Sequence, residues 1–440
     1  MPKSGVQPKR KTPIYYLGNK QSISREILNA ISDVAIGSGP AIDLFAGTGA
    51  VSRAISRYRN VIAVDVQEYS RILCSAFIEK HPNNANCIDE LLERSEARYR
   101  KLAEVYKPLL CLERASTEKA QSHDFEMLAE IIEHGCLLSQ YRSKKPTWLL
   151  EASDAVKEGR VNSSIEDDED MIARYFGGTY FSYEQALRLS SLRACCSDTS
   201  DETEVLAAIL STASLSASTI GGQLAQPVKA FDKYGKIKAR TLQKVLRIRN
   251  TEIFPTFEKA FHELNILAVP RDDNLAVKEE CINFLNNYNS KDPSIVYADP
   301  PYSRYHYSRY YHVLETIAMN DSPQISINPA TKQASRGIYR EERYQSSFST
   351  KGKAHKAFED LFKAVANVTP AFVLSYSPYL DSVDTTPRMA KIDELMELAK
   401  ESFTRVSCKT LVGTTHSKLA NSRDALVTVK DAEVLVICQN

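Results

Sequence analysis

The sharpest chemical pattern in the sequence is the run Asp299-Pro300-Pro301-Tyr302, directly after an apolar stretch. That stretch predicts a buried strand, so the polar groups should emerge at the carboxyl end of a sheet. The two prolines fix the backbone and remove two amide donors, which leaves a rigid turn that presents acceptors. This arrangement suits the activation of a planar amino group on a heteroaromatic ring. The Asp299 carboxylate and the Pro300 carbonyl would accept its two N–H hydrogens, and Tyr302 would stack on the base.

A glycine turn, Asp43-Leu-Phe-Ala-Gly-Thr-Gly49, is the second pattern. Gly47 and Gly49 would let the backbone approach a ligand closely or adopt a positive φ. A helical pattern follows at once, and the start of a helix offers unpaired N–H groups. Asp43 has an alternative role that is purely local, because its carboxylate could hydrogen-bond to nearby backbone instead of a ligand. Because Ser52 stands where the dinucleotide fingerprint has its third glycine, NAD is disfavoured.

Two further residue groups could complete a cofactor site. Asp65 ends a second apolar stretch, where a carboxylate can bind both ribose hydroxyls of an adenosine-containing cofactor. Its alternative role is to cap the strand end. Near the N-terminus, Tyr16 and Lys20 precede a helical pattern and could cover a cofactor and pair with a carboxylate, although alone they would indicate only an ordinary turn.

The elements that must position these residues alternate in the manner of a doubly wound α/β sheet. The expected strands are residues 41–45, 60–65, 294–299 and 371–375, with 406–412 and 433–438 as a closing hairpin at the sheet edge. A long stretch that includes a helical region at 88–138 interrupts this rhythm. We therefore expect a catalytic domain in two parts, 1–85 and 266–440, with a largely helical insertion at 86–265.

The insertion carries a basic segment opposed only by Asp232. Its members are Lys229, Lys233, Lys236, Lys238, Arg240, Lys244, Arg247 and Arg249. Clustered Lys and Arg supply the electrostatic part of nucleic-acid affinity, but a solvated helix face explains the same pattern. A second basic stretch follows the Asp299 region and has an ordinary solvated loop as its alternative. It comprises Arg336, Arg340, Arg343, Lys351 and Lys353.

Composition limits the class of protein. The 440 residues are 43% hydrophobic and 25% charged, which indicates a globular protein rather than a disordered chain. No apolar run approaches the roughly 18 residues of a membrane helix, and the basic residues 1–12 lead into no apolar stretch, so we expect neither a membrane span nor a secretory signal. Nine cysteines without a CxxC pair favour reduced thiols and a cytoplasmic location.

In their order along the chain, these motifs resemble the DNA adenine methylases of the alpha (D12) type. The lid motif Tyr16–Lys20, the turn Asp43–Gly49 and Asp65 come first, a long insertion follows, and Asp299–Tyr302 comes last. The resemblance extends to residues 177–183, 305–317 and 343–348, as in larger bacterial and phage members. It implies a Rossmann-like, S-adenosylmethionine-dependent methyltransferase fold with a mostly parallel seven-stranded sheet and an inserted DNA-recognition domain.

The resemblance also implies site residues. S-adenosyl-L-methionine would contact Tyr16, Lys20, Asp65 and Asp299, and the turn with Asp43, Phe45, Gly47 and Gly49 would cradle the methionine part of this cofactor. Asp299, Pro300, Pro301 and Tyr302 would be the catalytic group. The family usually has an acid near the cofactor's adenine. Glu280 stands there, but its neighbours match poorly and we assign it no role.

The function implied is site-specific methylation of the 6-amino group of adenine in duplex DNA. The adenine must leave the stack to be reached. The insertion would hold the DNA, with Lys229, Lys233, Lys236, Lys238, Arg240 and Lys244 on phosphates. The chemistry needs no metal. The expected context is restriction–modification or phage–host defence, with a cognate restriction endonuclease as a candidate partner.

Four alternatives differ in chemistry. Methylation of the cytosine ring needs a Cys nucleophile after a Pro turn, and no cysteine lies near Pro300 or Pro378. Methylation of the cytosine amino group would use Ser in place of Asp299. RNA adenine methyltransferases usually carry Asn there and lack the long insertion. A catalytically idle DNA-binding subunit would not need the full residue set. His306 and His312 are expected to pack or contact phosphate, without a catalytic role.

Overall fold

The computed structural model describes residues 13–16, 20–81, 87–138, 145–197, 199, 201–219, 223–289, 293–378, 388–411, 415–416, 429–430 and 433–440. Leu17, Gly18 and Asn19 of the lid motif lie outside the described residues, as do residues 1–12. Within the described part, no helix combines the length and the apolar character needed to cross a membrane.

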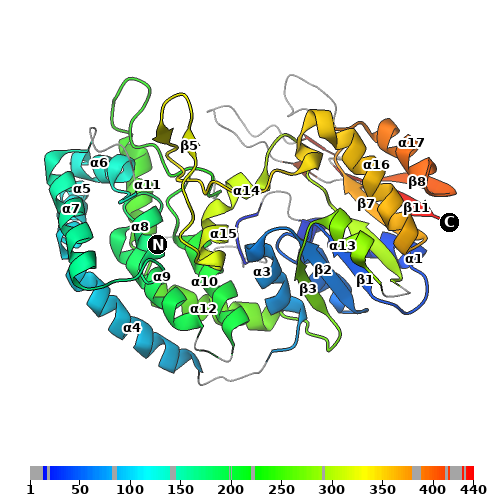
Figure 1. Ribbon diagram of the computed structural model, residues 1–440, viewed down its shortest axis with the longest axis horizontal. Helices are drawn as coiled ribbons and strands as arrows, with labels where there is room; N and C mark the ends of the chain where they lie inside the picture. Colours follow the sequence, from blue (N-terminus) through cyan, green and yellow to red (C-terminus); the bar gives the residue numbers. More distant parts are fainter. Residues whose placement is uncertain are drawn as a thin grey trace, which may run out of the picture.

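A seven-stranded sheet forms the right-hand part of the molecule in Figure 1. Its spatial order is β3 (Leu275–Lys278), β2 (Val61–Asp65), β1 (Ala41–Leu44), β4 (Ile295–Ala298), β7 (Ala371–Tyr376), β11 (Glu433–Gln439) and β8 (Arg405–Leu411). The first five strands are parallel, and β11 is antiparallel to both of its neighbours. The predicted α/β class and mostly parallel seven-stranded sheet are confirmed. In the closing hairpin, β11 lies inside the sheet and only β8 forms its edge. The strand β3 at the other edge was not predicted.

Alternation along each strand divides the sheet into two buried faces. Ile42 and Leu44 of β1 pack on the side of α13 (Cys281–Asn287), α16 (Lys351–Val368) and α17 (Ile392–Lys400). Ala41 faces the other side, with α1 (Ser24–Val34), α2 (Ala50–Ser56) and α3 (Glu68–Ile78). Both faces are covered by helices, and the central strands β1, β4 and β7 are buried along their whole length, as expected for parallel strands.

The helical left-hand part of Figure 1 comes from the chain between α3 and β3. Its helices are α4 (Cys87–Val105), α5 (Lys107–Gln121), α6 (Glu126–His134), α7 (Thr147–Asn162), α8 (Met171–Phe176), α9 (Tyr183–Cys196), α10 (Glu202–Ser216), α11 (Ala239–Arg249) and α12 (Ile253–Leu267). The helical region predicted at 88–138 is confirmed by α4, α5 and α6. Helix α10 is buried along almost its whole length and packs against α3, α9 and α12, because it is apolar on all sides. One hydrophobic core therefore runs from the sheet into the helices.

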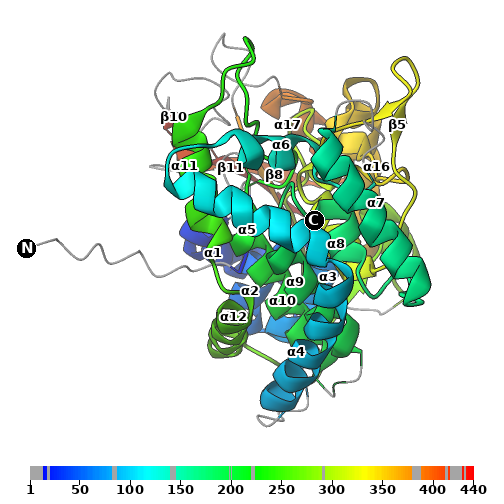
Figure 2. The ribbon, with the colours of Figure 1, turned by 90° about the vertical axis from the view of Figure 1, so that its left-hand side faces the viewer.

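The chain after β4 also reaches the helical part. Helices α14 (Tyr307–Tyr310) and α15 (His312–Met319) follow the strand, and α15 packs against α3 and α10. A short hairpin, β5 (Ile327–Asn328) and β6 (Gln333–Ala334), stands above them in Figure 1. The 3-10 helix η3 (Ser347–Ser349) then leads into α16, as η1 (Lys20–Ile23) leads into α1. A separate two-stranded pair joins β9 (Thr415–His416) to β10 (Val429–Lys430). Figure 2 shows the helical part from its own side.

Candidate active site

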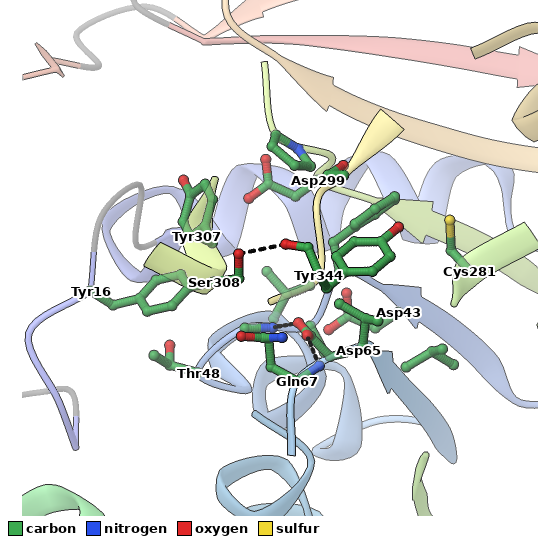
Figure 3. Close-up of a pocket in the computed structure, with 18 of the residues that line it drawn as sticks. Tyr16, Asp43, Thr48, Asp65, Gln67, Cys281, Asp299, Tyr307, Ser308 and Tyr344 are labelled. Atoms are coloured by element: carbon green, nitrogen blue, oxygen red, sulfur yellow. Dashed lines mark hydrogen bonds between the residues drawn. The ribbon is translucent and has the colours of Figure 1, made fainter. Parts of the chain in front are cut away.

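A pocket opens at the carboxyl ends of β1, β2 and β4, and it encloses about 970 Å³ including space open to solvent (Figure 3). Strand β1 lies between β2 and β4, so the chain order reverses here, and this is the usual ligand site of such sheets. The pocket brings together most of the predicted site residues. Those that line it are Tyr16, Lys20, Asp43, Phe45, Gly47, Asp65, Asp299 and Pro301. Gly49, Pro300 and Tyr302 are not among the lining residues.

The glycine turn between β1 and α2 takes an unusual backbone path. Phe45, Gly47 and Gly49 have φ of 61°, 57° and 71°, which side chains rarely tolerate. A Cβ at Gly47 would lie 2.8 Å from the Tyr16 hydroxyl oxygen, and a Cβ at Gly49 would lie 3.3 Å from the Cα of Cys74. Gly47 is therefore needed where Tyr16 covers the turn, and Gly49 where α3 packs against it.

An aromatic cluster holds Tyr16 over the turn. Its ring is stacked on Tyr311, with centroids 4.9 Å apart and 21° between the planes, and lies 5.6 Å from Tyr307. Tyr69 also packs against Tyr311. Burial raises the pKa of the Tyr16 hydroxyl well above its usual value. Tyr16 is thus a neutral aromatic wall of the pocket.

Asp65 ends β2 with its carboxylate fixed by backbone. Oδ2 accepts from the Gly47 N–H and Oδ1 from the Gln67 N–H, both at 2.9 Å (Figure 3). Burial raises the pKa of Asp65, and these backbone hydrogen bonds oppose the rise. The local capping alternative is therefore present in the structure. It does not exclude ligand binding, because a carboxylate has about four lone-pair sites.

Asp299 begins the turn after β4 and is paired with a buried lysine. Lys20 Nζ lies 2.9 Å from Asp299 Oδ1 and 3.3 Å from Glu433 Oε1, and Lys20 is only 5% exposed. Ser375 Oγ donates to Glu433 Oε1 at 2.7 Å. Burial opposes the charge on Lys20, but Asp299 and Glu433 outweigh it and raise the pKa of the amine well above its usual value. Lys20 is thus a permanent cation between two carboxylates.

Sequence reasoning did not find Glu433. It occupies the first position of a strand that is otherwise apolar, and 1% of its surface is exposed. An acid at the end of an apolar strand was the available signal, but its partner Lys20 lies at the other end of the chain. The contact exists only in the folded chain, where Glu433 lies on β11 next to β7 and reaches Lys20.

Tyr302 packs against protein in this structure. Its ring meets Tyr376 at 77° with centroids 6.0 Å apart, and the Arg388 guanidinium lies 4.7 Å from its centroid. Burial raises the pKa of Tyr302 to about 12. The packed-tyrosine alternative thus describes this conformation, and stacking on a base stays a prediction.

Asp43 lies on β1 beneath the pocket and is 1% exposed. Ser52 Oγ of α2 donates to its carboxylate. Burial raises the pKa of Asp43 to about 7; the Ser52 hydrogen bond lowers it and the nearby Asp299 charge raises it. The local bond expected as the alternative is thus made, although to a side chain rather than to backbone alone.

The pocket has further lining residues to which no role was assigned from the sequence. Thr48 and Gln67 adjoin the glycine turn and Asp65, and Glu279, Glu280 and Cys281 come from the turn after β3. The Glu280 carboxylate accepts from the N–H groups of Ile282 and Asn283, at 2.9 and 3.1 Å, and so caps α13. The resemblance had pointed to Glu280 as an acid near the cofactor's adenine without assigning it a role, and Glu279 and Cys281 were missed because β3 was not predicted.

The segments after β4 close another side of the pocket. Ser308 and Tyr344 both line it, and Ser308 Oγ donates to the Tyr344 carbonyl. His306 lines the pocket as well. His312 is fully buried beside Tyr180 and Tyr339, and burial lowers its pKa to about 3. His312 is therefore a neutral packing residue. Among the described residues, no three His, Cys, Asp or Glu side chains are grouped to hold a metal ion.

The basic segment lies apart from the pocket lining. Lys229, Lys233, Lys236, Arg240 and Lys244 are exposed, and Lys238 is partly buried. Residues 229–238 form a loop closed by the Phe231–Ile237 bridge, and α11 follows. Arg249 at the end of α11 is different: its side chain is buried, donates to the Gly178 carbonyl at 2.7 Å and lies 3.8 Å from Glu113 Oε1. Arg249 is thus structural, while the six predicted DNA-contacting residues face solvent at least in part.

Comparison with known proteins agrees with this geometry. A family model described as D12 class N6 adenine-specific DNA methyltransferase matches residues 16–140 and 222–370, more than half of the chain. A protein named Modification methylase LlaI, from Lactococcus lactis subsp. lactis, is 33% identical over 178 residues. That alignment covers 38% of this chain, and the chain spans only 26% of the length of this relative.

Proposed function

Because the chain belongs to the D12 class of N6 adenine-specific DNA methyltransferases, we propose that it transfers a methyl group from S-adenosyl-L-methionine to the 6-amino group of adenine in duplex DNA. One observation carries the proposal most directly. Asp299, which starts the Asp-Pro-Pro-Tyr turn, shares a pocket with the glycine turn after β1 and the carboxylate that ends β2.

The residues present fit the cofactor. Asp65 would hold the ribose hydroxyls, since its carboxylate is fixed by Gly47 and Gln67. Gly47 has no side chain, lies under the Tyr16 ring and lines the pocket, so the backbone of the turn is what a ligand would contact here. When bound, S-adenosyl-L-methionine would supply a methyl group made electrophilic by its sulfonium. The two carboxylates around Lys20 leave this end of the pocket with a negative balance that suits a cation.

The target amino group would meet the turn after β4. Asp299 and the Pro300 carbonyl would accept its N–H hydrogens and favour a pyramidal nitrogen, and Asp299 is placed to take the proton that the nitrogen loses. Lys20 holds the Asp299 carboxylate in one orientation. Catalysis would then consist of positioning and hydrogen bonding, as in other preorganised sites. The adenine would be flipped out of the duplex, at a cost of a few kcal/mol.

The helical part would bind the DNA. We propose residues 86–265 as a target-recognition domain inserted between catalytic parts 1–85 and 266–440, with the six basic residues from Lys229 to Lys244 on phosphates. The name of the Lactococcus relative supports a restriction–modification context, in which a cognate endonuclease would be the partner.

Transfer of labelled methyl into duplex DNA tests the proposal, with RNA as a second substrate. Wild type should label DNA as 6-methyladenine, and Asp299→Ala should lower the rate at least 100-fold, as loss of a key group at such a site does. Asp273→Ala, an exposed acid outside the pocket, is the matched control. If only RNA is labelled, the proposal that duplex DNA is the substrate is wrong. If neither nucleic acid is labelled while the cofactor binds, an idle DNA-binding subunit is the better description.

A further inference from the structure

Two arginines pack on the same tyrosine beside the pocket. The guanidinium carbons of Arg309 and Arg343 lie 5.3 and 4.7 Å from the centroid of the Tyr339 ring. Arg309 Nε also donates to the Tyr339 hydroxyl at 3.0 Å, and that hydroxyl donates to the Ala225 carbonyl at 2.6 Å. Tyr339 is 6% exposed. A buried ring, tied to the helical part of the chain, therefore holds both cations in place.

These two arginines differ from the nearby Arg336 and Arg340 in having no acidic partner among the described residues. Arg336 pairs with Glu133 at 2.8 Å, and Arg340 pairs with Asp321 at 2.6 Å. Over the residues that the structure describes, neither Arg309 nor Arg343 forms an ion pair, and the Nε of Arg343 is buried without a hydrogen-bond partner. Burial lowers the pKa of Arg343, and the charge of Arg309 lowers it further. Two guanidinium groups that both lie within 5.3 Å of one ring centroid, without an ion-pair partner in the described part of the chain, favour binding of an anion.

The position of the pair suggests which anion. Arg309 directly follows Ser308, and Arg343 directly precedes Tyr344; both neighbours line the pocket and are joined by the Ser308–Tyr344 hydrogen bond. Both arginines are therefore chain neighbours of pocket-lining residues. Burial lowers the pKa of the lining residue His306, and Arg343 is near enough to lower it further. When a base enters the pocket, the phosphates on either side of that nucleotide must lie near the pocket entrance, because only the sugar separates a base from its phosphates.

We propose that Arg309 and Arg343 together bind one backbone phosphate of the DNA strand whose base enters the pocket. This inference rests on the proposed function, because it takes duplex DNA as the substrate. Arginine suits this role because its planar fork can donate two hydrogen bonds to phosphate oxygens while its face stays on the tyrosine. Arg336 and Arg340, in contrast, hold the protein's own loops together.

The test measures binding of a labelled mixed-sequence duplex at several salt concentrations. Arg309→Gln/Arg343→Gln should weaken binding and reduce the slope of log K against log salt by about 1, the value for one phosphate contact. The variant Arg309→Lys/Arg343→Lys should retain the wild-type salt slope, because lysine keeps the positive charge. A retained slope would also show that substitution at these two positions does not unfold the protein. Arg57→Gln/Arg405→Gln is the matched control, because both arginines are exposed at the opposite end of the sheet strands.

The outcomes separate this inference from the proposed function. If wild type methylates DNA while the double Gln variant binds with an unchanged slope, the phosphate site is wrong and the function stands. If the control pair loses as much slope, the effect is general charge and the site is again wrong. If wild type transfers no methyl group but the Gln variant alone loses slope, the phosphate site stands and the proposed function falls.

Discussion

The Lys20 ammonium lies 2.9 Å from the Asp299 carboxylate, with the Glu433 carboxylate 3.3 Å away on its other side. The three residues come from the start of the chain, from the turn after β4 and from the last strand. A buried cation between two acids fixes the carboxylate that begins the Asp-Pro-Pro-Tyr turn. It also makes the site sensitive to loss of the Lys20 charge, because two buried carboxylates would then lack a partner.

Lys20→Met should destabilise the protein by about 3–5 kcal/mol, the usual cost of removing one partner from a buried ion pair. Lys20→Met/Glu433→Gln should lose less, because it leaves one uncompensated carboxylate rather than two. Urea unfolding measures both. Lys400→Met is the control, since Lys400 pairs with Glu397 on the surface and should change stability by at most about 1 kcal/mol. Equal losses in the single and double variants would refute a shared charge network.

Gly47→Ala should cost more stability than Gly37→Ala. Both glycines have nearly the same φ, 57° and 56°, so both substitutions carry backbone strain of about 1–2 kcal/mol. A Cβ at Gly37 meets nothing within 4 Å, whereas one at Gly47 meets the Tyr16 hydroxyl at 2.8 Å. Urea unfolding should show the excess for Gly47→Ala, and Tyr16→Ala should remove that excess. An excess that persists without the Tyr16 ring would show that Tyr16 is not its cause.

Asp43 should make stability depend on pH. Its pKa in the folded protein, about 7, lies above the ordinary 3.8, because burial disfavours the charge. Between these values the unfolded chain binds fewer protons than the folded one, so this contribution to stability is full below pH 3.8 and is lost as pH rises through about 7. The substitution Asp43→Asn removes this pH-dependent loss of stability, because asparagine does not ionise. Relative to wild type, the variant should therefore gain stability between pH 4.5 and pH 8, on the order of 1 kcal/mol or more.

Urea unfolding of wild type and Asp43→Asn at both pH values measures this difference, and other titrating groups cancel in it. Asp33→Asn, at an exposed position on α1, serves as the control. A stability difference between wild type and Asp43→Asn that does not change with pH would mean that Asp43 stays ionised in the fold.

The basic segment should contribute sequence-independent DNA affinity. Lys236→Gln/Arg240→Gln should weaken binding of a mixed-sequence duplex and lower the salt slope by about 2, one for each lost phosphate contact. Lys101→Gln/Arg114→Gln removes the same charges from exposed positions on α4 and α5 and should leave the slope near its wild-type value. If both pairs reduce the slope equally, the segment is a solvated surface, as its alternative interpretation holds.

Local patterns were enough to predict the sheet strands and the residues at their carboxyl ends. Val61–Asp65 and Ile295–Ala298 are short apolar runs that end in a carboxylate or lead into one, and such runs are typical of the buried strands of parallel sheets. The edge strand Leu275–Lys278 was missed because only three apolar residues precede the charged run Lys278-Glu279-Glu280. Glu279 and Cys281 of the pocket were missed with it, whereas Glu280 was noticed from the resemblance but assigned no role.

The sequence by itself determined the chemistry that could occur: a glycine turn, an acid after the second strand and an Asp-Pro-Pro-Tyr turn. Only the tertiary structure decided which groups stand next to them. Glu433 beside Lys20, Tyr16 over Gly47, and Arg309 on Tyr339 all join residues that are distant along the chain. The physical reason is that spacing along a strand or helix fixes only neighbours on the same element, whereas contacts between elements depend on strand order and packing.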